Sequence, residues 1–146
     1  MNKYFIALIA AIILLPSLYA VISPTLYTAK VEWHNYKEAR VMNSDKPIFV
    51  FAKMRFCLTC AAMEKDTFTQ PSLAKLLNER FIPVKETINF ALSNFVFDDL
   101  QDQEGEQLTF RGFPAVMIIQ GDNYSLIHGY KSAEQLHELL NKVLNN

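Results

Sequence analysis

Runs of hydrophobic residues, and the spacing between them, predict a domain in which helices and strands alternate. Residues 48–52 are apolar throughout, as expected of a central strand that is covered on both faces. Residues 31–43 and 132–144 carry apolar side chains at three- or four-residue spacing, which predicts two amphipathic helices. The first of these helices would place on one face Trp33, Tyr36, Ala39 and Met42.

Two further helices are expected between these, in the middle of the chain. The first begins at a pair of cysteines and covers residues 57–68. The second covers residues 72–80 and has its own start signal in Pro71 and Ser72. Ser132 is the expected N-cap of the last helix.

The remaining hydrophobic segments predict strands. In residues 81–88, Pro83 favours an edge position or a bulge, because proline has no backbone N–H for a central ladder. Residues 115–120 and 125–129 predict a hairpin. The crossover through residues 57–68 would make the first two strands parallel, whereas the hairpin adds antiparallel strands. The expected fold class is therefore α/β, with a central mixed sheet flanked by helices.

The stretch 89–106 has no clear periodicity but is rich in apolar side chains. They are Phe90, Phe95, Val96 and Phe97. Two interpretations are open: these side chains dock on the core, or they form an apolar contact surface near the functional site.

The N-terminus has the composition of an export segment. Lys3 precedes a long apolar run, which is followed by Pro16 and the small residue Ala20. Residues 4–22 carry no charge and are nearly long enough to span a bilayer, so a cleaved signal peptide and an uncleaved membrane anchor are both open. Either one predicts export, with the domain in the periplasm or anchored in the inner membrane and facing the periplasm.

The length of the chain indicates its domain organisation, and its charge argues against nucleic-acid binding. The 146 residues suit a signal or anchor at 1–23, a linker at 24–30 and one domain at 31–146. The formal net charge is −1, and lysine and arginine are dispersed along the chain. This pattern excludes the basic footprint of a nucleic-acid-binding protein.

The chain's only two cysteines, Cys57 and Cys60, directly follow the apolar strand. Their spacing places both on one face of a helix, one turn apart, with Cα atoms within the roughly 4.4–6.8 Å window of a disulfide. At the helix N-terminus, unpaired amides and the helix dipole favour a thiolate. Cys57 is therefore predicted to be the reactive sulfur, and Cys60 the partner that closes the disulfide.

Two other interpretations of the cysteine pair stay open. A purely structural disulfide is one, although closing so short a loop constrains the unfolded chain very little. Half of a metal site is the other, although the histidines that could complete it are scattered. They are His34, His128 and His137.

Residues 30–146, which include the cysteine pair, resemble the thioredoxin superfamily. The pieces that carry the resemblance are Lys46-Pro47, Cys57-Leu58-Thr59-Cys60, Glu64-Lys65, Thr67-Phe68 and Gly112-Phe113-Pro114. Within the superfamily they look most like the C-terminal, periplasmic domain of the transmembrane disulfide reductase DsbD. The resemblance implies a thioredoxin-like fold.

It also implies roles for particular residues. Pro114 would be the family's cis-proline facing the cysteines, and Phe113 and Pro114 would bind the substrate backbone. Glu64 matches a glutamate of the DsbD-like group, one helical turn from Cys60. It would either help to move the proton of Cys60 or be an ordinary solvated carboxylate. Phe51 stands where many thioredoxins have a buried acid.

The expected function is an exported thiol–disulfide oxidoreductase that acts on disulfide-containing proteins, with Cys57, Cys60 and Glu64 as catalytic residues. The residues between the cysteines, Leu58-Thr59, lack the histidine of strongly oxidising relatives, which favours the reductase direction. Electrons would come from a separate redox partner protein, and no cofactor is expected. The alternative is a thioredoxin-fold copper chaperone that binds metal through the two thiolates.

Overall fold

The computed structural model describes residues 29–89, 96–101, 105 and 108–145. The expectations for the signal or anchor segment, and for Phe90 and Phe95, lie outside these residues.

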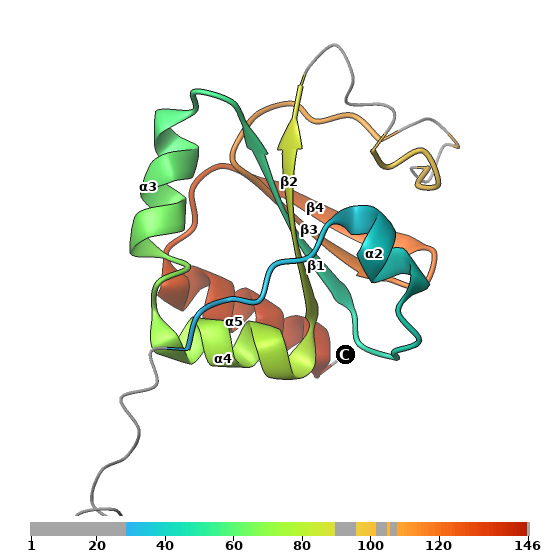
Figure 1. The fold of residues 1–146 in the computed structure, drawn as a ribbon, viewed down its shortest axis with the longest axis horizontal. Helices are drawn as coiled ribbons and strands as arrows, with labels where there is room; N and C mark the ends of the chain where they lie inside the picture. Colours follow the sequence, from blue (N-terminus) through green and yellow to red (C-terminus); the bar gives the residue numbers. More distant parts are fainter. Residues whose placement is uncertain (1–28, 90–95, 102–104, 106–107, 146) are drawn as a thin grey trace, which may run out of the picture.

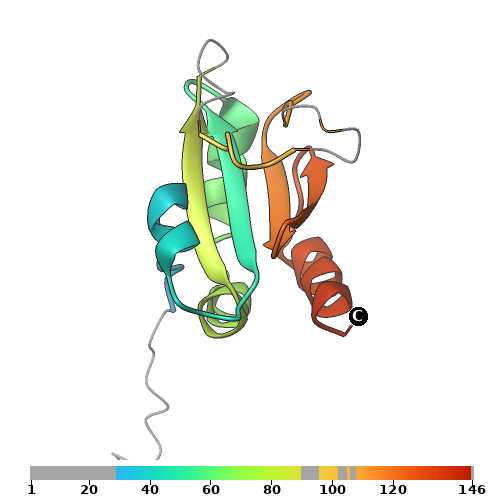
Figure 2. The ribbon, with the colours of Figure 1, turned by 90° about the vertical axis from the view of Figure 1, so that its right-hand side faces the viewer.

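Four strands form one sheet in the order β2-β1-β3-β4 (Figures 1 and 2). The strands are β1 (Ile48–Met54), β2 (Ile82–Ile88), β3 (Ala115–Gln120) and β4 (Asn123–His128). β1 pairs with β2 in parallel, whereas β3 is antiparallel to both β1 and β4. The predicted mixed sheet, its parallel crossover and its terminal hairpin are confirmed.

Helices cover both faces of the sheet. They are α2 (Tyr36–Val41), α3 (Leu58–Asp66), α4 (Pro71–Arg80) and α5 (Ala133–Leu144). Figure 1 shows α2 on one side of the strands and α3 on the other. Within the described part of the chain, no helix has the length and apolar character needed to cross a membrane.

The alternation of side chains along β1 divides the core into two clusters. Val50 points into the cluster beneath α2, whereas Phe49 and Phe51 point into the cluster formed with α3, α4 and α5. All three are fully buried. This two-sided burial explains why the strand is apolar throughout.

The helix predicted at residues 31–43 is wrong in its extent. α2 covers Tyr36–Val41, because the side chain of Asn35 accepts a hydrogen bond from the Glu38 amide and the Glu38 carboxylate accepts one from the Asn35 amide. This capping box starts the helix only there. Trp33 precedes the cap, and the next residue, His34, forms a β-bridge with Val84. Trp33 therefore packs in the cluster opposite to that of Tyr36.

Pro83 lies on the edge strand β2, as predicted. Its carbonyl accepts a hydrogen bond from the His34 amide, and the Lys85 amide donates to the His34 carbonyl. Residues 83 and 85 therefore turn their backbone groups away from β1. The absent N–H of proline removes no bond from the ladder with β1.

The described part of the irregular stretch docks on the core. Phe97 and Leu100 are buried, and Val96 packs against the same cluster. The Phe97 ring meets Tyr36 at 4.6 Å between centroids, and the Tyr36 hydroxyl donates to the carboxylate of Asp99. Core docking is thus confirmed for Val96 and Phe97.

Candidate functional site

The cysteine pair lies where β1 ends and α3 begins. Cys57 is the N-cap of α3, and its Sγ accepts a hydrogen bond from the Cys60 amide at 3.1 Å. The two residues form a disulfide with Cα atoms 5.2 Å apart. Cys60 is only 1% exposed, whereas Cys57 is partly exposed. The sulfur at the helix N-terminus is therefore the one that another molecule can reach.

Two apolar side chains flank Cys57 in solvent. Phe56 is 94% exposed and Leu58 is 87% exposed. Phe56 has a φ of 61°, in the left-handed region that costs a non-glycine residue roughly 1–3 kcal/mol. Large apolar side chains this exposed beside a reactive group are typical of a contact surface.

The Phe113–Pro114 peptide bond is cis, at the beginning of β3. The pairing of Ala115 with Ala52 places this bond at the end of the sheet from which the Cys57 loop leaves β1. Phe113 and Cys57 pack against the same hydrophobic cluster. The Pro114 carbonyl accepts a hydrogen bond from the Gly129 amide at 2.7 Å, which joins the end of β4 to this loop.

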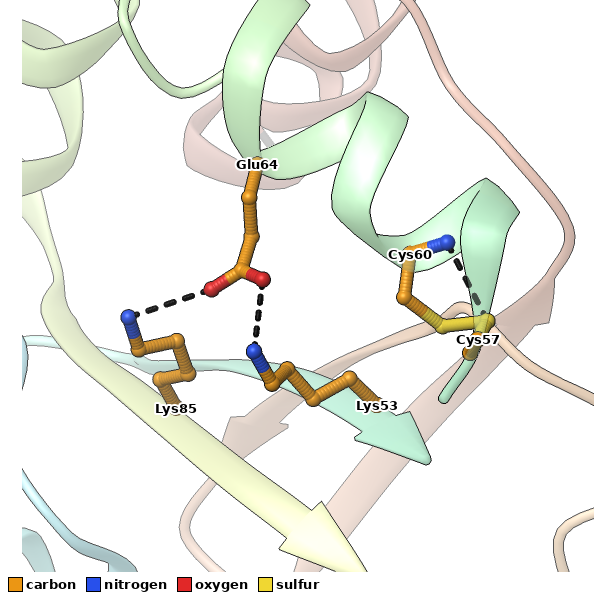
Figure 3. Close-up of polar contacts among 5 residues, drawn as sticks. All are labelled: Lys53, Cys57, Cys60, Glu64 and Lys85. Atoms are coloured by element: carbon orange, nitrogen blue, oxygen red, sulfur yellow. Dashed lines mark hydrogen bonds and ion pairs between the residues drawn. A yellow bond between two sulfur atoms is a disulfide. The ribbon is translucent and has the colours of Figure 1, made fainter. Parts of the chain in front are cut away.

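Glu64 lies one turn after Cys60 on α3 and reaches two lysines (Figure 3). One carboxylate oxygen is 2.5 Å from Lys53 Nζ, and the other is 3.2 Å from Lys85 Nζ. Partial burial alone would raise the pKa of Glu64, but the hydrogen bonds and charges of the two lysines outweigh it and hold that pKa below its ordinary value. Glu64 is an ionised, paired carboxylate and not a freely solvated one.

Trp33 joins this ion cluster to an aromatic cluster that includes Phe51 and Phe68. Lys85 Nζ lies 5.4 Å from the centre of the Trp33 ring, within the range of a cation–π interaction. Phe51 is fully buried, and its ring lies 4.7 Å from that of Phe68. The position where many thioredoxins have a buried acid is thus part of an aromatic core, and Glu64 is the carboxylate that lies one turn after Cys60 on the cysteine-bearing helix.

The cysteines and Glu64 line one cleft of about 560 Å³. Its lining residues are Lys53, Met54, Arg55, Phe56, Cys57, Leu58, Cys60, Ala61, Glu64 and Thr87. The cleft thus combines the redox-competent sulfurs with positive charge and apolar surface. Phe113 and Pro114 are not among its lining residues and lie at the neighbouring strand end.

An α/β domain whose cysteine pair begins the helix after the first central strand, with a cis-proline at the adjacent strand end, belongs to the thioredoxin-like class. A family model described as a thioredoxin-like domain matches residues 35–144. The chain therefore belongs to the thioredoxin-like family, and the resemblance drawn from the sequence is confirmed. No curated protein gives a significant match.

Solved structures share the fold at low sequence identity. A thioredoxin from Thermus thermophilus is 15% identical, with 79% of this chain and 88% of that one covered and a TM-score of 0.61. The DsbH oxidoreductase is 16% identical, with 86% and 94% covered and a TM-score of 0.59. The C-terminal domain of DsbD from Neisseria meningitidis, in its oxidised form, is 22% identical, with 67% and 80% covered and a TM-score of 0.48.

The pairing of Glu64 with lysines was not predicted from the sequence. Lys53 comes from β1 and Lys85 from β2, so neither spacing nor helix periodicity brings them to Glu64. The signal that could have found Lys53 is its interruption of an apolar strand just before the cysteines. Among the described residues, no group of three His, Cys, Asp or Glu side chains could hold a metal ion.

Proposed function

We propose that this protein is an exported thiol–disulfide oxidoreductase that reduces disulfides in other proteins. The observation that carries the proposal is the asymmetry of the two sulfurs: Cys57 is accessible at the N-terminus of α3, and Cys60 is buried directly behind it. The thioredoxin-like fold and this disulfide support an oxidoreductase. The reductase direction rests on Leu58-Thr59, and export rests on the composition of residues 1–23.

The reaction proceeds by two exchanges. The Cys57 thiolate attacks one sulfur of the substrate disulfide, a mixed disulfide forms, and the other substrate sulfur leaves as a thiolate. Cys60 then loses its proton and attacks the Cys57 sulfur, which releases the second substrate sulfur. Two electrons have passed to the substrate, and the Cys57–Cys60 disulfide remains. A separate dithiol protein restores the reduced pair by the reverse sequence.

Side chains around Cys57 would hold the substrate. Phe56 and Leu58 offer apolar contact area on either side of the attacking sulfur. Phe113 and Pro114 lie at the adjacent strand end, where the substrate backbone would pass. Such a surface suits an extended apolar segment around the substrate disulfide. Binding would bury the exposed apolar side chains and let the segment make backbone contacts at the strand end.

The test is insulin reduction by the purified full chain in the presence of dithiothreitol. The wild type should accelerate reduction, and Cys57→Ser should abolish the acceleration, because a hydroxyl is far too weakly acidic to replace the thiolate. With dithiothreitol removed after reduction, Cys60→Ser should instead accumulate a mixed disulfide with insulin, since no second thiol resolves it. Wild-type activity no greater than that of Cys57→Ser would refute the proposal.

A copper chaperone is the second candidate. Two thiolates are soft ligands that suit Cu(I), and the accessible Cys57 supports this role. The described residues offer no third His, Cys, Asp or Glu ligand that would complete a site with the pair, so the metal would be held mainly by the two sulfurs or shared with a partner. Stoichiometric copper in the reduced protein, without insulin reduction, would favour this candidate.

A further inference from the structure

Residues 108–114, which lead into β3, form neither helix nor strand. Their backbone groups therefore depend on partners outside a regular ladder. The ring of Phe110 is buried and fixes one part of this segment in the core, and the Phe113 ring stacks on it at 5.5 Å between centroids. The far end is fixed by the hydrogen bond from the Gly129 amide to the Pro114 carbonyl. The backbone between these two anchors leads directly into the cis bond.

His128 contacts the backbone in that interval. The Arg111 amide donates a hydrogen bond to Nε2 of the His128 ring at 3.1 Å. Because this nitrogen accepts, the ring is the neutral tautomer that carries its proton on Nδ1. His128 is the last residue of β4 and pairs with Ala115, the first residue of β3. The bond therefore ties the segment before β3 to the end of the neighbouring strand.

From this geometry we infer that His128 is a positioning residue for substrate binding. Through the Arg111 amide it holds the backbone that presents Phe113 and Pro114 to the substrate. His128 is not among the residues that line the cleft of the disulfide, so its effect should fall on substrate binding and not on the chemistry of the sulfurs. The inference rests on the proposed function, because it takes Phe113 and Pro114 as the contacts of the substrate backbone.

The expected effect follows from what the hydrogen bond restricts. Without the acceptor, the Arg111 amide turns to water and the segment gains conformations that do not fit a substrate. Binding must then select the fitting conformation, which weakens the apparent affinity. A neutral hydrogen bond of this kind corresponds to about three- to tenfold in an equilibrium constant. A loss that is equal in the ground state and the transition state raises KM and leaves kcat unchanged.

The test measures initial rates of insulin reduction by the full chain over a range of insulin concentrations, with dithiothreitol as the electron source. His128→Phe keeps a planar ring without an acceptor, so KM should rise about three- to tenfold while kcat and the alkylation rate of Cys57 stay within about twofold of the wild type. His128→Gln places an amide oxygen within reach of the Arg111 amide and should keep KM within about twofold. The matched control is His137→Phe, the same change at a histidine of α5 that contacts Asn141, and it should alter none of these values.

A second measurement, amide hydrogen exchange at Arg111 in the oxidised protein, needs no substrate. Exchange should accelerate about three- to tenfold in His128→Phe, but not in His128→Gln or His137→Phe. Unchanged exchange in His128→Phe, a KM no higher than that of His137→Phe, or a glutamine variant as impaired as the phenylalanine variant would overturn the inference. So would a slower alkylation of Cys57, which would place the effect on the sulfur.

Should His128→Phe fail to fold, His128→Thr takes its place with the same expected results. Threonine suits a strand, and its hydroxyl is too short to reach the Arg111 amide. A wild type that does not reduce insulin would refute the proposed function, whereas exchange at Arg111 would still decide whether His128 holds this segment.

Discussion

At the scale of single residues, the two cysteines differ in what surrounds them. Cys57 ends an extended segment and has the first turn of α3 beneath it, where the helix dipole favours negative charge. Cys60 lies within the helix and is packed among aromatic and aliphatic side chains, where burial disfavours a thiolate. The same motif thus provides one sulfur suited to attack and one suited to resolve.

Alkylation of the reduced protein should separate the two sulfurs. Cys57 should react with iodoacetamide well below the pH at which a free thiol of pKa about 8.5 reacts. Cys60, which is nearly fully buried, should lag behind. Peptide mass mapping after timed quenching measures both rates. Faster labelling of Cys60, or labelling of both only near the free-thiol pH, would contradict the assignment.

The pairing of Glu64 predicts how stability changes with pH. Because the folded-state pKa lies below the ordinary value of 4.5, the carboxylate stabilises the fold above that value, and the stabilisation is lost as pH falls through the folded-state pKa. The difference in unfolding free energy between the wild type and Glu64→Gln should therefore shrink between about pH 5 and pH 3. Urea unfolding of the oxidised protein measures it.

The control for this experiment is Glu79→Gln, which removes a carboxylate from an exposed pair at 3.9 Å. An exposed pair contributes little, so the free energy of unfolding should change little at any pH. A difference for Glu64→Gln that stays constant over the same range would show that the carboxylate is not stabilised in the folded state.

Residue roles were predictable from sequence only where they depend on local geometry. The placement of Cys57 at a helix N-terminus follows from a strand, a short loop and a helix in succession. Glu64 was predicted to lie near Cys60 for the same reason. Its two lysine partners depend on which strands pair beneath α3, and local spacing contains no information about that pairing.

At the scale of elements, sequence pattern predicted type better than extent. The strands and the last helix follow the hydrophobic periodicity, and Ser132 caps α5 as expected. The first helix failed because apolar spacing alone did not reveal the start set by Asn35. The spacing of Trp33, Tyr36 and Ala39 matches a helical stripe. In the structure, however, Trp33 packs on the face of the sheet opposite to Tyr36 and Ala39.

Tyr36 connects α2 to the segment that follows β2. Its buried hydroxyl donates to both oxygens of Asp99 at 2.9 and 3.0 Å, and Arg40 Nε lies 2.7 Å from the same carboxylate. Burial first, and then the bond to Asp99, raises the pKa of Tyr36 above its ordinary value of 10.0. The hydroxyl therefore remains a donor throughout the neutral range.

Tyr36→Phe should lower the free energy of unfolding by about 1–2 kcal/mol, because a hydrogen bond to a charged group is lost while partly exposed Asp99 regains water. Urea unfolding at neutral pH measures the change. The control is Tyr130→Phe, at a tyrosine that is 39% exposed, where a much smaller change is expected. Equal effects of the two substitutions would show that the Tyr36–Asp99 bond contributes no stability of its own.

At the scale of the whole molecule, the sheet separates two hydrophobic clusters that support different parts of the structure. The cluster with α3, α4 and α5 supports the cysteines, and the cluster beneath α2 anchors the irregular segment after β2. β1 contributes side chains to both clusters, and the chain runs from its end directly to Cys57. A redox site at one end of so buried a strand is held firmly, while its reactive side chain remains at the surface.

Export is the prediction that concerns the full chain. Residues 1–30 fused to a phosphatase that is active only outside the cytoplasm should give activity, because a basic start and a long uncharged apolar run direct a chain across the membrane. The matched control carries Ile9→Asp and Ile13→Asp. Each acid in the apolar run costs about 2.5–3.5 kcal/mol on an insertion scale, so activity should be lost. Membrane fractionation and the mass of the product then distinguish an uncleaved anchor from a cleaved signal. Equal activity of the fusion and its control would remove the basis for placing this oxidoreductase outside the cytoplasm.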